Sequence, residues 1–180
     1  KENFVVLNVN GVCYKVFKNK KTLENLPALQ QPLQVFSYLN VKEDALDLYG
    51  FLSEDDLNFF EKLISVNGIG PKTALGVMGL ASVDRLAAAI NEGKSDLLTR
   101  AAGVGKKIAE RIVLELKGRL PLLSSRETVK NMESDLDVEE ALVGLGYSRA
   151  EARSALSRID VGVVGLEARL KEALKRFKKN

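Results

Sequence analysis

The sequence predicts an α+β multidomain protein: a small β-barrel over residues 1–52, an all-α domain over residues 53–120, a flexible linker over residues 121–135 and a three-helix domain over residues 136–180. Three observations predict this order. Apolar and polar residues alternate near the N-terminus, as they do in strands. At Ser53 the apolar spacing changes to that of a helix. Residues 121–135 are polar and show neither period, which is typical of a linker.

Two strand pairs are expected in the first unit. Residues 4–17 alternate around Asn10-Gly11, the strongest short signal for a hairpin with a type I′ turn. Residues 34–41 and 45–51 predict a second pair, with Lys42-Glu43-Asp44 at or near its tip. Residues 18–33, which are rich in lysine and punctuated by proline, predict a loop with a strand fragment. Four or more short strands are typical of a small barrel such as the OB-fold.

Helices are expected from Ser53 onward. Ser53 to Asp56 resembles a capping box, with Asp in place of the usual Glu or Gln. Breaks at 68–70, 79–82, 93–95 and 103–105 then predict about five short helices, the last of which ends at Pro121. In the final unit, breaks at 144–147 and 160–165 predict three helices in a UBA-like arrangement, and Ser148 to Glu151 is a full capping box.

Composition narrows the classes of function. The chain has 180 residues, of which 46% are hydrophobic, enough to form real cores, and no apolar run approaches the length of a membrane span. A single cysteine excludes an internal disulfide and a cysteine zinc cluster. The chain has no histidine, which weighs against hydrolytic catalysis, and we expect neither metal nor cofactor. Lys and Arg outnumber Asp and Glu by ten to six in residues 61–120 but not in residues 1–60, where the ratio is six to eight.

Two segments of the predicted all-α domain are copies of each other. Residues 63–75 and 98–110 match at an offset of 35 residues, which pairs Gly68 with Gly103, Gly70 with Gly105, and Lys72 with Lys107. In each copy, glycines that can adopt positive φ allow a tight turn, and the apolar residue between them can pack between two helices. The helix that follows presents free N–H groups and a partial positive charge to an anion, and the lysine adds a full charge.

Other phosphate-binding motifs fit these segments poorly. A dinucleotide fingerprint would need a third glycine at position 73 or 108, and the P-loop pattern is absent. One Gly-x-Gly could be an ordinary helix–helix turn, whereas two copies with a lysine at the same offset favour nucleic-acid backbone binding. The arrangement resembles the helix-hairpin-helix motif, which grips DNA phosphates without reading bases.

The order of units carries a more specific resemblance. Its elements are Val9-Asn10-Gly11-Val12-Cys13-Tyr14, Glu43-Asp44-Ala45 leading into Leu48-Tyr49-Gly50-Phe51, the two Gly-x-Gly-x-Lys hairpins, and Ala141-Leu142-Val143-Gly144-Leu145-Gly146-Tyr147. With these elements the chain resembles, over nearly its whole length, the RuvA family of bacterial proteins that recognise Holliday junctions.

The resemblance implies a non-catalytic subunit that binds four-way junction DNA as a homotetramer, or as an octamer, in recombination and in repair during the SOS response. It implies an acidic pin at Glu43 and Asp44, which without the resemblance would be read as a plain polar tip. The phosphate-binding residues that it implies are Gly68, Ile69, Gly70, Lys72, Thr73, Gly103, Val104, Gly105, Lys106 and Lys107.

The resemblance also implies partners and a location. The third domain would bind a RuvB-type ATPase motor through a surface near Leu142, Leu145 and Tyr147, although each of these residues could equally be core. A junction resolvase is a further expected partner, and a membrane is not. The expected location is the bacterial cytoplasm, in association with the nucleoid.

One departure concerns the barrel. Family members carry a strand before the segment that begins here at Glu2-Asn3-Phe4, and the sequence printed here lacks it. A barrel without that strand would expose a sheet edge.

Two other classes of function stay open. A helix-hairpin-helix glycosylase, lyase or nuclease would need a catalytic Asp, often with a Lys, and Asp84 and Lys94 are available but lie in no recognisable context. A protein-interaction adaptor would use the hairpins only as structure.

Overall fold

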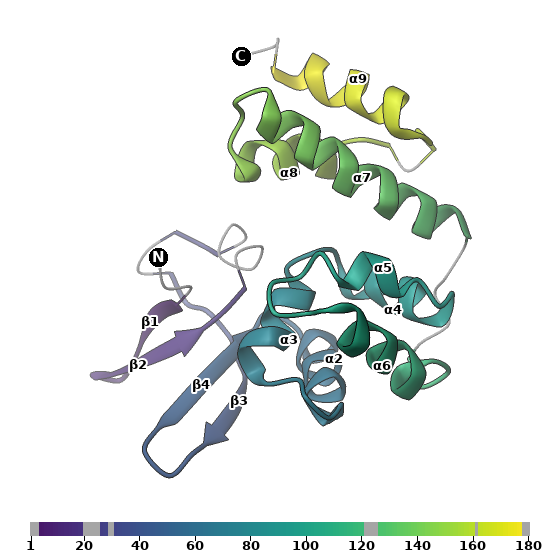
Figure 1. Cartoon of the computed structure of the whole chain (residues 1–180). Coiled ribbons are helices and arrows are strands. Elements are labelled where there is room, and N and C mark those ends of the chain that lie inside the picture. Colours follow the sequence, from purple (N-terminus) through teal and green to yellow (C-terminus); the bar gives the residue numbers. More distant parts are fainter. Residues whose placement is uncertain (1–3, 20–25, 29–30, 121–125, 161, 178–180) are drawn as a thin grey trace.

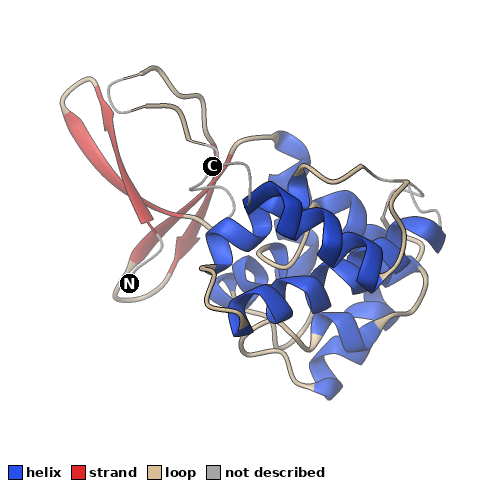
Figure 2. Cartoon of the chain, turned by 90° about the horizontal axis from the view of Figure 1, so that it is seen from above, coloured by secondary structure: helices blue, strands red, loops and turns tan. Residues whose placement is uncertain are grey.

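The computed structural model describes residues 4–19, 26–28, 31–120, 126–160 and 162–177. Four strands precede a group of helices, and Figures 1 and 2 show the strands at one end of the molecule and the helices beside them. No single helix among the described residues is long and apolar enough to cross a bilayer. One pair of helices, 71–78 and 83–91, meets that test only when counted together, and it is bent by 97°.

The two predicted hairpins are confirmed. β1 (Phe4–Val9) pairs with β2 (Val12–Phe17), and β3 (Phe36–Val41) pairs with β4 (Leu46–Phe51). Asn10 and Gly11 have φ of 50° and 91°, as a type I′ turn requires. Parallel pairing of β2 with β4 gives the sheet order β1-β2-β4-β3, which leaves β1 at an edge. Residues 26–28 and 31–35 form no strand.

Aromatic side chains join the sheet to the helices. α2 (Glu54–Ser65) begins at Ser53, whose hydroxyl accepts a hydrogen bond from the Asp56 N–H, as the sequence predicts. The helix turns Phe60 toward β4, where its ring lies 4.9 Å from Phe51 and 5.6 Å from Tyr49, centroid to centroid. All three rings are fully buried, so the sheet and the helical domain share one core.

Five helices lie within residues 54–116, as the glycine breaks predict. After α2 come α3 (Pro71–Met78), α4 (Val83–Asn91), the single-turn α5 (Ser95–Leu98) and α6 (Lys106–Leu116). Alanines and larger apolar residues of α4 lie at the centre of this domain and are almost wholly buried.

The predicted linker is wrong from Arg126 onward. Residues 126–135 form the first half of α7 (Arg126–Gly144), a helix of 19 residues, and residues 121–125 lie outside the described chain. Met132 and Leu136 are buried in the core of the all-α domain, whereas Val138 and Leu142 are buried in a separate C-terminal core. Because the apolar residues of α7 serve two cores, the helix lacks the single apolar stripe by which a helix is recognised from sequence.

Three helices form the C-terminal unit, as predicted. α8 (Arg149–Ser157) and α9 (Leu166–Phe177) pack on α7. The capping box at Ser148 is complete: its hydroxyl accepts from the Glu151 N–H at 3.2 Å, and its own N–H donates to the Glu151 carboxylate at 2.8 Å. Tyr147 stacks on Phe177 with 4.0 Å between ring centroids, which ties the α7–α8 turn to the end of α9.

Candidate nucleic-acid interface

The two glycines of each repeated turn differ in conformation. Gly68 and Gly103 have φ of 90° and 81°, in the left-handed region that only glycine enters easily. Gly70 and Gly105 have φ of −92° and −81°, which any residue can adopt. The expectation that both glycines supply positive φ therefore holds only for the first of each pair.

The second glycine of each pair leaves open space. A Cβ built on Gly70 or on Gly105 would meet no described atom within 4 Å. The fold itself therefore does not require glycine at these positions, and a ligand can approach the backbone closely there. Both residues are the N-caps of the helices that follow, with Pro71 at the first position of α3 as predicted. The exposed side chains of Lys72, Lys106 and Lys107 surround the two helix ends.

The N-termini of α3 and α6 differ electrostatically from those of five other helices. Acidic residues occupy the first turns of α2, α4, α5, α8 and α9, where they offset the positive end of the helix dipole. The first turns of α3 and α6 carry lysine and no acidic residue, and no side chain caps either helix. The first N–H groups of a helix have no partner within it, and in α6 only the third of them, on Ile108, is taken up, by the Gly105 carbonyl at 3.0 Å. Both helix ends can therefore donate to an external anion.

Ile69 and Val104 hold the turns together. Their side chains are 6% and 4% exposed and lie in the core, as expected of the residue between the glycines. Their N–H groups donate within the turn, to the Val66 carbonyl and to the Ala101 carbonyl, both at 3.1 Å. Because these donors are occupied, the expectation that Ile69 and Val104 contact phosphate directly is corrected to a structural role.

Direct contacts hold the two turns side by side. Arg111 of α6 donates from Nη1 to the carbonyl of Asn67 in the first turn at 2.9 Å. In the other direction, the hydroxyl of Thr73 on α3 lies 3.6 Å from the position a Cβ on Gly103 would take. The predicted residues of both copies thus form one surface, and Thr73 lies where the two turns meet.

Sequence reasoning missed Arg111. It occupies the position that Gly76 fills in the first copy, at the same offset of 35 residues. A Cβ on Gly76 would lie 3.4 Å from the Ala102 carbonyl of the second turn, so each of these equivalent positions faces the opposite turn. The second copy has an arginine where the first has a glycine, and this difference could have pointed to Arg111 in the sequence.

Glu43 and Asp44 lie at an exposed tip. They stand between β3 and β4, where the Lys42 N–H donates to the Ala45 carbonyl at 2.8 Å and closes the turn. The tip of the second hairpin is where the sequence predicts these residues, whereas the function of the two carboxylates stays a prediction.

The expected partner surface is only partly exposed. Leu142 is fully buried in the C-terminal core, so its assignment as a contact residue is wrong. Tyr147 is half-buried against Phe177, and Leu145 is 63% exposed. Leu145 therefore stays the best candidate for a surface contact.

The residues proposed for a repair enzyme do not form a site. Asp84 lies in the first turn of α4, and the Lys94 ammonium pairs with Glu133 of α7 at 3.0 Å. Among the described residues, no group of three or more His, Cys, Asp or Glu side chains could hold a metal ion.

Three family models match the chain. The RuvA N-terminal domain matches residues 1–50, a SAM-like helix-hairpin-helix tandem matches residues 60–118, and the RuvA C-terminal domain matches residues 137–177. The tandem model covers both glycine turns.

Full-length relatives agree with the models. A protein of Thermoanaerobacter sp. (strain X514) is 40% identical over 180 residues, which are 99% of this chain and 93% of the relative. One from Acetivibrio thermocellus is 39% identical over 96% of this chain and 91% of its own length, and one from Dehalococcoides mccartyi (strain CBDB1) is 38% identical over 98% and 92%. Each is called a Holliday junction branch migration complex subunit RuvA. The identity, the coverage and the order of the matched domains show that this chain belongs to the RuvA family.

Proposed function

We propose that this chain is the non-catalytic, Holliday-junction-binding subunit of a branch migration complex, acting in DNA recombination and repair. The name shared by its relatives supports the junction as ligand and the existence of a complex. Within this chain, the N-termini of α3 and α6, whose first turns carry lysine and no acidic residue, support it most directly.

The proposed contact is with the phosphate backbone. We call each repeated turn with the start of its helix a clamp: the first runs from Gly68 to Thr73 and the second from Gly103 to Lys107. Each clamp would bind phosphate through first-turn N–H groups and a lysine, next to a glycine, Gly70 or Gly105, that has open space around its Cα. Such contacts position a protein on DNA without reading bases, which suits a ligand defined by its branching rather than by its sequence.

The proposed assembly is a homotetramer, with an octamer as a further form. Four copies would present eight clamps to four DNA arms, so that weak clamps give tight binding together. Glu43 and Asp44 would act as the pin at the crossover, where carboxylates repel phosphates and keep the strands apart.

The proposed partner is a RuvB-type ATPase, bound by the C-terminal unit through a surface that includes Leu145. A junction resolvase is a further proposed partner, and the proposed location is the bacterial cytoplasm, in association with the nucleoid. The exposed side chain of Leu145, next to the Tyr147–Phe177 stack, supports the choice of surface.

A competition gel shift tests the proposal. A four-way junction would compete with linear duplex of matched length and sequence at about 0.15 M salt, where phosphate contacts contribute strongly. We expect a strong preference for the junction, retarded species of tetramer mass, and a salt slope of roughly −7 if each of eight clamps neutralises one phosphate. Equal and weak binding to both DNAs would overturn the proposal.

Charge reversal tests the clamps themselves. The Lys72→Glu/Lys107→Glu variant should lose junction binding. The matched control Lys171→Glu/Lys175→Glu, which reverses the same charge on α9, should keep it. If DNA binding survives in the Lys72→Glu/Lys107→Glu variant, the hairpins are only structural and the chain is an adaptor.

A further inference from the structure

A row of carboxylates on α7 faces the cations of the all-α domain. Glu133 pairs with Lys94 at 3.0 Å, and Asp137 pairs with Arg100 at 2.7 Å. Glu140 lies 3.8 Å from the same arginine. These three acids stand at positions i, i+4 and i+7, so they share one face of the helix.

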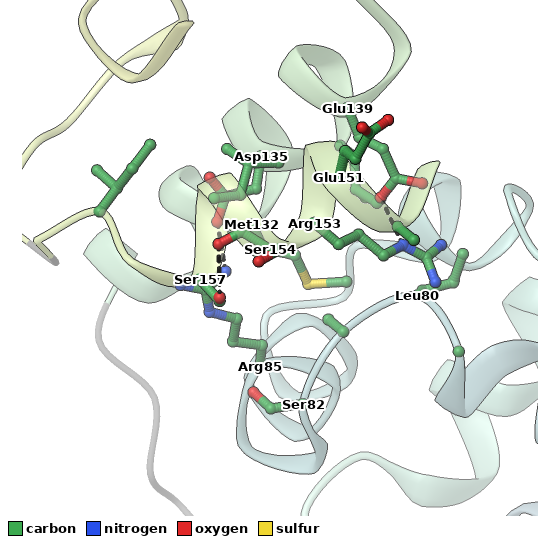
Figure 3. Close-up of a pocket in the computed structure, with 16 residues that line it drawn as sticks. Leu80, Ser82, Arg85, Met132, Asp135, Glu139, Glu151, Arg153, Ser154 and Ser157 are labelled. Atoms are coloured by element: carbon green, nitrogen blue, oxygen red, sulfur yellow. Dashed lines mark hydrogen bonds and ion pairs between the residues drawn. The ribbon is translucent and has the colours of Figure 1, made fainter. Parts of the chain in front are cut away.

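The row is held in place by buried contacts. Met132 and Leu136 are buried in the core of the all-α domain, beside an ion pair between Asp135 of α7 and Arg85 of α4. Asp135 also accepts from the fully buried Arg169 of α9. Figure 3 shows Arg85, Met132 and Asp135 on the wall of the groove between α4, α7 and α8. Buried apolar and ionic contacts therefore fix α7, and the carboxylates at its edge stay beside Arg100.

Arg100 lies close to the second clamp along the chain. It precedes Gly103 by three residues, so the two Cα atoms are at most about 11 Å apart. The backbone between them folds tightly, because the Arg100 N–H donates to the Leu97 carbonyl and the Val104 N–H to the Ala101 carbonyl. At the same offset in the first clamp stands Ser65, which has no charge.

We propose that Asp137 and Glu140 compete with DNA phosphate for Arg100, so that the docked C-terminal unit restrains the second clamp. This inference rests on the proposed binding of phosphate by the hairpins. A guanidinium binds carboxylate and phosphate with the same bidentate geometry, so one ligand can replace the other. The side chains of Arg100, Asp137 and Glu140 are 32%, 46% and 68% exposed, so these ion pairs are weak and a phosphate can reach them.

The competition couples two distant events. A phosphate that captures Arg100 removes two contacts of α7, and a partner that pulls on the C-terminal unit releases Arg100 toward DNA. Thermodynamic linkage requires the two effects to be equal in size. The C-terminal unit can therefore influence DNA binding without contacting DNA.

Neutralising the two carboxylates tests the proposal in the full chain. Junction affinity would be measured by fluorescence anisotropy as salt is varied, for the wild type and for Asp137→Asn/Glu140→Gln. We expect binding to tighten by about three- to tenfold at 0.15 M salt, with a slope steeper by about 0.9 for each added phosphate contact. The control Glu167→Gln/Glu172→Gln removes the same charge from α9 and should bind as the wild type does.

Arg100→Gln separates competition from general repulsion. In that background the Asp137→Asn/Glu140→Gln change should add nothing, because the residue for which the acids compete is gone. The inference would be overturned if Asp137→Asn/Glu140→Gln still raised junction affinity in the Arg100→Gln background, or if it left the affinity of the otherwise wild-type chain unchanged. Loss of binding in Lys72→Glu/Lys107→Glu together with either of those results would leave the proposed function intact and remove only this inference.

Discussion

Arg111 in the second hairpin copy donates a 2.9 Å hydrogen bond to the carbonyl of Asn67 in the first, 44 residues earlier in the chain. The bond joins one glycine turn to the other, so the fold sets the spacing of the two turns. If both turns bind phosphate as proposed, this fixed spacing would let them meet one DNA backbone without a further loss of conformational entropy.

Arg111→Gln should therefore weaken junction binding by several-fold while changing stability little. A partly exposed hydrogen bond contributes about 1 kcal/mol, so the thermal midpoint should fall by only a few degrees. Arg111→Lys keeps the charge but not the planar fork, and it separates the loss of geometry from the loss of charge. Wild-type affinity in both variants would show that the turns hold their spacing without this contact.

The two glycines of each turn should respond oppositely to alanine. Gly68→Ala and Gly103→Ala place a Cβ at positive φ and should cost about 1–2 kcal/mol of unfolding free energy each. Gly70→Ala and Gly105→Ala meet open space, so the loss of glycine at these two N-caps should cost no more than about 1 kcal/mol each, yet both changes should weaken DNA binding because the new methyl groups occupy the approach to the backbone. Urea denaturation and anisotropy titrations on the same four variants check both halves. If Gly70→Ala/Gly105→Ala bound junction DNA as tightly as the wild type, phosphate would not bind next to these two glycines.

Asp135→Asn should destabilise the contact between α7 and its neighbours. The change leaves the fully buried Arg169 guanidinium without its carboxylate, which costs about 3 kcal/mol. Glu133→Gln is the matched control two residues earlier, where the partly exposed pair with Lys94 contributes less than about 1 kcal/mol. Urea unfolding followed by circular dichroism compares them, and equal loss in the two variants would contradict the central role of Asp135.

The capping box of α8 should make its stability depend on pH. Hydrogen bonds from the Ser148 hydroxyl and N–H lower the pKa of Glu151. Because the pKa is lower in the folded than in the unfolded chain, this contribution is complete at neutral pH and is lost as the pH falls below about 4. Glu151→Gln should accordingly melt below the wild type at pH 7, and the two should converge as the pH falls through the lowered pKa of Glu151. A constant difference across that range would exclude the carboxylate as its source.

Much of the fold follows from short-range chemistry that the sequence displays. The Asn10-Gly11 turn, the caps at Ser53 and Ser148 and the breaks at the hairpin glycines depend on residues within four positions of each other, and each element was predictable. The geometry of the two glycine turns was predictable for the same reason, because a glycine turn, a lysine and a helix N-terminus are contiguous in the chain, whereas their binding of phosphate stays a prediction.

Other features depend on which residues meet across the fold. The first half of α7 reads as polar linker because Met132 and Leu136 complete a core formed by residues far earlier in the chain. Leu142 is just as apolar as Leu145, and only packing buries one and exposes the other. Arg111 pairs with Asn67, which is 44 positions away in the chain, and Arg100 pairs with Asp137, which is 37 positions away.

The sequence by itself determined the order of units, the two repeated glycine turns and the family. The tertiary structure decided which charged side chains pair with each other and how α7 packs on the all-α domain. The physical reason is range: turns, caps and helix dipoles act over one helical turn, whereas burial and ion pairing depend on distances that exist only after the chain has folded.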